Sequence, residues 1–148
     1  MDLDRRMVWL AVGISVLILA VAILFFSFQK GPLAGKAIAT TISLTSCTQS
    51  GGWISGKTYI LANDVTATTG NCFTPSKDNL VIDCNGKRIT GGNNGAGVYI
   101  YSRSGITVQN CVISRFDKGI IAMNSQGNTF TGNTLRGNNH GIVLYDSS

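Results

Sequence analysis

The sequence has no glutamate, only two prolines and a single histidine, and charged residues make up 13% of its 148 positions. Long soluble helices need Ala, Leu, Glu and Lys in quantity, and these are scarce beyond the N-terminal segment. No Cys-x-x-Cys or Cys/His spacing typical of zinc occurs. From Ala37 onward eight Lys or Arg accompany five Asp without forming a basic cluster, so nothing indicates a nucleic-acid-binding surface. The 18 Gly and the abundant Asn, Ser and Thr predict short strands and turns instead.

One hydrophobic segment stands apart from this composition. Residues 7–28 contain no charge, and Arg6 and Lys30 lie on either side of them. A run of this length can cross a hydrocarbon core of about 30 Å as a helix, and it exceeds the apolar core of a typical signal peptide. We therefore predict a transmembrane signal anchor at 7–28, a cytoplasmic tail at 1–6 and a linker at 29–46. The small residues at 37 and 39 leave cleavage open as the alternative to an uncleaved anchor.

All four cysteines follow the predicted anchor: Cys47, Cys72, Cys84 and Cys111. An even number of cysteines in a small exported domain favours disulfides, and it places this domain outside the cytoplasm with the N-terminus inside. Four cysteines allow three pairings. We expect Cys47 to pair with Cys72 at the irregular start of the domain, while Cys84 and Cys111 form either a second disulfide or two buried thiols.

The chain repeats itself with a period of 22 residues. The segments GVYIYSRS, GIIAMNSQ and GIVLYDSS begin at Gly97, Gly119 and Gly141. Between them GITVQNCVISRFDK aligns with GNTFTGNTLRGNNH, and residues 79–92 form an earlier, imperfect copy followed by a small insertion. Apolar residues alternate with a period of two inside each unit, which indicates short strands with one buried face. A fixed period of this length predicts a solenoid in which each unit is one coil.

Stacking the coils in register places equivalent residues above one another at a spacing of about 4.8 Å. One coil cannot bury its own apolar face, so we expect neighbouring coils to cover it and the inward-facing residues to form the core. The predicted interior ladders are Val98–Ile120–Ile142, Ile100–Ala122–Leu144, Ile106–Asn128, Val108–Phe130 and Ile113–Leu135.

The pattern GI-x-L-x-x-SS followed by N-x-F/I-x-x-N-x-L/I resembles the right-handed parallel β-helix repeat of NosD-like proteins and of carbohydrate-binding and sugar-hydrolase domains. The resemblance covers residues 79–148, and YILANDV with GNCF at 59–73 resembles a first coil. It implies an all-β fold, a right-handed parallel β-helix with coils of about 22 residues over 47–148, preceded by one transmembrane helix. Because no cap follows Ser148, we expect the domain to continue beyond it.

The repeat region lacks the side-chain pairs that enzymes of this fold use. Asp83, Asp117 and Asp146 occupy different positions of the repeat, so they should not converge on a calcium ion, which needs six to eight oxygen ligands. No Asp pair is present to act as acid and base on a glycosidic bond. His140 precedes a glycine as in polygalacturonases, but its partners are absent and we expect an exposed loop residue. A lone histidine with Met123 makes a poor copper site, so we predict no catalytic residues, no metal and no cofactor.

The outward-facing residues of the repeat are more informative. They form two columns, Tyr99–Ile121–Val143 and Tyr101–Met123–Tyr145. Tyrosine combines a flat apolar face with a polar tip, which suits stacking on sugar rings or a protein interface. The alternative explanation is that these residues have high β propensity and stabilise cross-strand packing. We take Tyr99, Tyr101, Met123 and Tyr145, here called the outer stripe, as the candidate ligand-binding residues.

These observations predict a membrane-anchored, extracytoplasmic β-helix for surface recognition, through carbohydrate binding or adhesion to glycans or surface proteins. An enzyme acting on polysaccharide, a lyase or hydrolase, stays an alternative if catalytic coils lie beyond residue 148, and an acidic cluster in further sequence would reveal it. A purely structural surface stalk is the third interpretation, since the fold alone does not fix a function.

Overall fold

The computed structural model describes residues 40–48 and 52–148, which belong to a compact unit spanning Ala39–Ser148. These residues form strands, turns and bends without a helix. The predicted anchor at 7–28 and the tail at 1–6 lie outside the described residues. Within the ranges 40–48 and 52–148, no helix is long and apolar enough to cross a membrane.

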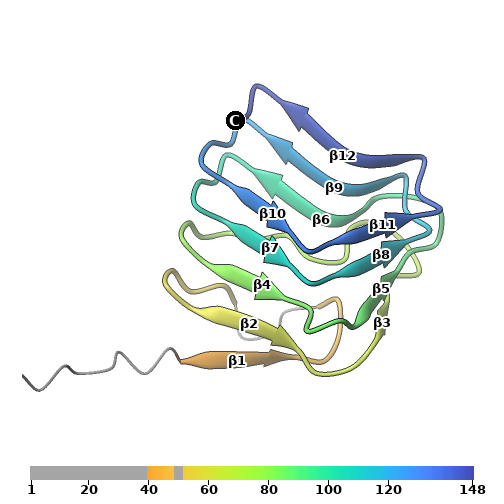
Figure 1. Ribbon diagram of the computed structural model, residues 1–148, viewed down its shortest axis with the longest axis horizontal. Coiled ribbons are helices and arrows are strands. Elements are labelled where there is room, and N and C mark those ends of the chain that lie inside the picture. The colour runs from red at the N-terminus through yellow and green to blue at the C-terminus, as the bar shows by residue number, and fades with distance from the viewer. Residues whose placement is uncertain (1–39, 49–51) are drawn as a thin grey trace, which may run out of the picture. The chain divides into compact units, whose positions relative to one another are not determined.

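Twelve short strands of the described chain stack into three parallel sheets (Figure 1). Sheet A contains, in spatial order, β1 (Thr41–Leu44), β2 (Thr58–Leu61), β4 (Val81–Asp83), β7 (Thr107–Gln109) and β10 (Thr129–Thr131). Sheet B contains β3 (Val65–Thr66), β5 (Arg88–Thr90), β8 (Val112–Ser114) and β11 (Thr134–Arg136). Sheet C contains β6 (Ala96–Tyr101), β9 (Lys118–Met123) and β12 (His140–Tyr145). Because the chain visits sheets A, B and C in turn, each circuit is one coil of a parallel β-solenoid, which confirms the predicted coil architecture.

Neighbouring coils pair in the register that the repeat predicts. Ile120 on β9 lies between Val98 on β6 and Ile142 on β12. The same register holds in the other two sheets and confirms the ladders Ile100–Ala122–Leu144, Val108–Phe130 and Ile113–Leu135. Asn128 takes the place above Ile106, where its side-chain oxygen accepts a hydrogen bond from the Ile106 backbone amide at 2.8 Å.

The imperfect copy differs from the later coils only in its corners. Val81 pairs with Thr107, which is 26 residues further on, and Arg88 pairs with Val112, which is 24 residues further on. By Ala96 and Lys118 the offset has reached 22. Two extra residues therefore lie in the turn between β4 and β5, and two more between β5 and β6, so the strands keep their register.

The first coil begins earlier in the chain than the repeat indicates. β1 lies inside the stretch predicted as a linker, yet it pairs in parallel with β2 along its whole length. The segment 59–73 forms the coil that its sequence suggests, with β2, β3 and a bridge from Phe73 to Val98 of sheet C. The Trp53 ring packs on the Tyr59 ring at a centroid distance of 4.6 Å and covers the core beside β2.

The core consists of the inward-facing residues of all three sheets, and most of them are completely buried. Ile82, Ile100 and Ile113 have no exposed surface. On β12 the equivalent residues Ile142 and Leu144 are 44% and 50% exposed, because no strand of the described chain lies beyond β12 in sheet C. The contrast shows that the burial of each coil depends on the next coil.

Three asparagines at successive corners connect one coil to the coil before it. The side-chain oxygens of Asn128, Asn133 and Asn138 each accept a hydrogen bond from the backbone amide 22 residues earlier. Their side-chain amides each donate to the carbonyl 25 residues earlier. These bonds satisfy backbone groups that the sheets leave unpaired at the corners, which accounts for the regular spacing of asparagine in this unit.

The glycine that opens each repeat occupies a position with no room for a side chain. A Cβ on Gly97 would lie 2.4 Å from Ile113 Cγ2 and 2.7 Å from the Gly119 carbonyl oxygen of the next coil. A Cβ on Gly119 would lie 2.7 Å from the Gly141 carbonyl oxygen, whereas one on Gly141 would meet nothing closer than Leu135 Cδ1 at 3.9 Å. Close stacking of backbone on backbone therefore selects glycine in this column.

We expect Gly97→Ala to lower the free energy of unfolding by about 1–3 kcal/mol, because the added methyl group overpacks the core against a carbonyl that cannot move freely. Gly141→Ala is the matched control, and it should change stability by less than about 0.5 kcal/mol. Denaturant unfolding followed by circular dichroism measures both values. Equal midpoints for the two variants would contradict the steric explanation.

Two disulfides cross-link the described coils. Cys47 bonds to Cys72, as predicted, and ties the segment after β1 to the end of the first coil. Cys84 bonds to Cys111, so the second predicted alternative, a pair of buried thiols, does not apply. Both sulfurs of the second disulfide are buried, at the corner where sheet A turns into sheet B.

Replacing both Cys84 and Cys111 by alanine should lower the free energy of unfolding by about 2–5 kcal/mol, because the unfolded chain loses a cross-link between residues 27 positions apart. The comparison with Cys47→Ala/Cys72→Ala separates the two bonds. Mass spectrometry of the non-reduced, exported protein should detect no free thiol, and alkylated cysteines in that sample would argue against the pairing.

Candidate functional site

The outer stripe lies on the solvent side of sheet C, with its residues in the predicted columns. Tyr99 is aligned with Ile121, and Tyr101 with Met123, across β6 and β9. Tyr145 on β12 continues the column of Tyr101 and Met123. Because these positions alternate with the buried Val98 and Ile100, the strand pleat directs them away from the core.

The residues of the outer stripe differ in accessibility. Tyr101 and Tyr145 are 50% and 53% exposed, whereas Tyr99 and Met123 are only half-buried to intermediate. The rings of Tyr99 and Tyr101 stand nearly parallel, with an interplanar angle of 12° and centroids 6.4 Å apart. The Tyr99 hydroxyl donates to Met123 Sδ at 3.8 Å, which connects the two columns.

Ile121, at the centre of the first column, is only 5% exposed although it points outward. It lies between Tyr99 and Val143 in the sheet, and these neighbours cover it. The stripe is therefore a small packed layer with two projecting tyrosines, Tyr101 and Tyr145, rather than a uniformly open apolar strip.

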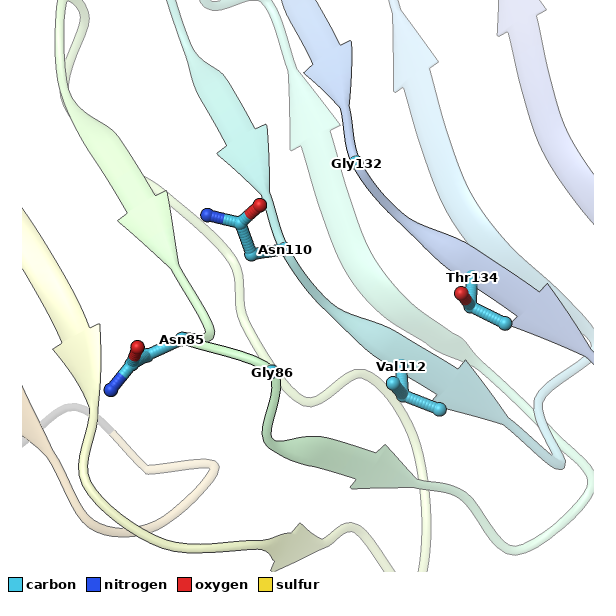
Figure 2. Close-up of a pocket in the computed structure, with 6 residues that line it drawn as sticks. All are labelled: Asn85, Gly86, Asn110, Val112, Gly132 and Thr134. Atoms are coloured by element: carbon cyan, nitrogen blue, oxygen red, sulfur yellow. The ribbon is translucent and has the colours of Figure 1, made fainter.

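A groove with a volume of about 440 Å³ lies on another part of the surface, where sheet A turns into sheet B (Figure 2). It crosses three coils and is lined by Asn85, Gly86, Asn110, Val112, Gly132 and Thr134. We did not predict this groove from the sequence. Its signal was the recurrence of turn-forming residues at equivalent corners, Asn110 in one coil and Gly132 in the next, both with left-handed backbone (φ 54° and 62°).

Asp83, at the end of β4, organises one wall of the groove. Its carboxylate accepts hydrogen bonds from Gln109 Nε2 at 2.7 Å, from the Asn110 side-chain amide at 3.1 Å and from the Asn85 backbone amide at 2.8 Å. Partial burial acts to raise the pKa of Asp83, but the three hydrogen bonds outweigh it and hold the pKa below its usual value near 3.8.

The other acidic residues of the repeat lie apart from Asp83, as their repeat positions predicted. Asp117 forms an ion pair with Lys118 and accepts a hydrogen bond from the Asn139 side-chain amide at 3.1 Å. The Lys118 contact, with help from Asn139, holds the pKa of Asp117 below its usual value. His140, expected in a loop, is instead the exposed first residue of β12, with Nδ1 3.9 Å from the Asp117 carboxylate.

No group of three or more His, Cys, Asp or Glu side chains that could hold a metal ion occurs in the part of the chain that the structure describes. All four cysteines are consumed by disulfides. Tyr99 already donates to the sulfur of Met123. The described residues therefore present projecting tyrosines and a polar groove as their candidate sites.

Three parallel sheets, a coil repeat and two disulfides define an extracytoplasmic β-solenoid domain. A comparison with protein-family models agrees with this class: residues 40–148 match the family described as periplasmic copper-binding protein (NosD). The match covers more than half of the chain, so the chain belongs to the NosD family. No curated protein and no solved structure gives a significant match.

Asp83 should stabilise the fold above its unfolded pKa near 3.8 and lose this contribution as the pH falls through its lower folded pKa. Asp83→Asn should therefore reduce the dependence of the unfolding midpoint on pH between about pH 4 and pH 2. Gln109→Ala, which removes one donor, should have a smaller effect of the same sign. Denaturant titrations at several pH values test this, and identical pH profiles for Asp83→Asn and the unmodified protein would contradict the assignment.

Proposed function

We propose that the domain recognises carbohydrate at the cell surface through the outer stripe of sheet C. The observation that carries the proposal is the pair of nearly parallel rings of Tyr99 and Tyr101, together with the half-exposed Tyr145 two coils away. A sugar ring presents apolar C–H faces and a rim of hydroxyls. A tyrosine meets both features, because its face is apolar and its tip forms hydrogen bonds.

The spacing of the exposed tyrosines supports an extended ligand. Tyr101 and Tyr145 occupy the same column with Met123 between them. At about 4.8 Å per coil, the two exposed rings lie roughly 10 Å apart, which is close to the span of two linked pyranose units. The half-buried Met123 between them offers an adaptable apolar surface for the intervening unit.

Adhesion to a surface protein is the related alternative. The accessible apolar part of the stripe is small, since Ile121 is buried and only Tyr101 and Tyr145 project strongly. A stable protein interface usually buries about 800 Å² on each partner and contains a larger apolar centre. The small stripe therefore favours a narrow ligand over a broad protein surface.

Copper binding, which the family description names, is not proposed for the described residues. Copper prefers imidazole, thiolate and thioether ligands. In this part of the chain the cysteines are oxidised, and the sulfur of Met123 accepts a hydrogen bond from Tyr99. The donor set of the described coils does not fit a copper site.

Catalysis on polysaccharide has little support in the same coils. Asp83 is held as a carboxylate by three donors, and Asp117 is ion-paired with Lys118. Neither carboxyl group has the raised pKa that a general acid requires. We also propose that residues 7–28 tether the domain to the membrane, with the solenoid on the extracytoplasmic side.

The stripe proposal is tested by glycan-array screening, followed by titration calorimetry with the glycans that bind. Tyr101→Ala and Tyr145→Ala should each weaken binding by about two- to tenfold, because each removes one stacking surface. Tyr101→Phe is the matched control, since it keeps the ring and should retain most of the affinity. Unchanged affinity in both alanine variants, with the unfolding midpoint preserved, would show that the stripe has only a structural role.

A further inference from the structure

We infer that the groove between sheets A and B is a second ligand-binding site, which takes a neutral, hydroxyl-rich chain such as an oligosaccharide lying across the coils. The groove belongs to the corner of sheets A and B, whereas the outer stripe belongs to sheet C. The inference therefore depends on a different set of residues from the proposed stripe function.

The groove is built by the same corner in three successive coils. Asn85 and Gly86 come from the turn after β4, and Asn110 and Val112 from the end of β7 and the start of β8. Gly132 and Thr134 supply the third coil, and Thr134 is paired with Val112 in sheet B. Figure 2 shows Val112 and Thr134 projecting side by side from neighbouring strands.

Glycine keeps the groove open to the backbone. A Cβ on Gly86 would meet no atom within 4 Å, so the space beside this residue is empty. Its φ of 76° also disfavours any larger residue. A ligand can therefore approach the main chain at Gly86, which a side chain at that position would prevent. The Cys84–Cys111 disulfide lies next to these residues in both coils and fixes their spacing.

The polar groups of the groove have a defined orientation. The Asn110 side-chain amide donates to the Asp83 carboxylate, which can only accept hydrogen bonds when ionised. This contact requires the Asn110 side-chain oxygen to point away from Asp83, where it is an acceptor for a ligand donor. The exposed Asn85 amide and Thr134 hydroxyl add further donors and acceptors along the same surface.

The lining excludes other classes of ligand. It contains no lysine or arginine to hold an anion. The nearby Asp83 carboxylate is engaged by three donors, and one such group does not supply the six or more oxygens that a calcium ion needs. Val112 is the single large apolar side chain in the lining, which is too little for a hydrophobic ligand. Amide, hydroxyl and glycine groups repeated at about 4.8 Å suit a chain of neutral sugar units.

The test uses the full 148-residue chain in detergent micelles, ¹⁵N-labelled, with neutral oligosaccharides of two to six units and a sulfated oligosaccharide as the charged control. Chemical-shift changes should appear at the backbone amides of Gly86 and Gly132 and grow with oligosaccharide length. Binding to the outer stripe would instead shift Tyr101, Met123 and Tyr145. The two sites are thus distinguished in one spectrum.

Two variants at one position make the test specific. Thr134→Val keeps the shape but removes the hydroxyl, and it should weaken groove binding by about two- to tenfold. Thr134→Trp should fill the groove and abolish the shifts at Gly86, while Tyr101→Ala and Tyr145→Ala should leave them unchanged. The inference is overturned if no neutral oligosaccharide shifts Gly86 or Gly132, if Thr134→Trp leaves these shifts intact, or if only the sulfated control produces them.

Discussion

The parallel pairing of each coil with the next is the interaction on which the rest of the structure depends. Strands of only two to six residues have little stability alone, and a single coil leaves one apolar face uncovered. Stacking provides the backbone partners and the covering surface together. The graded exposure of one interior ladder, from the fully buried Val98 and Ile120 to the open Ile142, shows how strongly burial depends on the neighbouring coil.

The corners of the solenoid are chemically different from its sheets. Inside the corners, Asn128, Asn133 and Asn138 connect consecutive coils through their side-chain amides. Outside one corner, left-handed residues such as Asn110 and Gly132 form the groove. The sheets therefore supply cohesion, while the corners supply most of the polar groups that a ligand in the groove could contact. The outer stripe is the exception, because it lies on the face of a sheet.

Most of the fold could be predicted from the sequence because a period of 22 and an alternation of two are both visible in the letters. The ladder of Val98, Ile120 and Ile142 follows from those periods alone. β1 was missed because it precedes the recognisable repeat and is held by pairing with β2. The partnership of Cys84 and Cys111 stayed open, because extra corner residues prevent a simple count along the repeat.

The candidate sites were less predictable for a related reason. Alternation correctly directed Ile121 outward, but it did not indicate that Tyr99 and Val143 would cover it. The groove arises from the way two sheets meet, and this depends on backbone conformation at Asn85 and Asn110. The four additional residues in the turns around β5 have a broader consequence: sequence can lengthen at a corner while every strand keeps its partner. Corners are thus the positions where evolution can graft new loops, and with them new specificities, without rebuilding the scaffold.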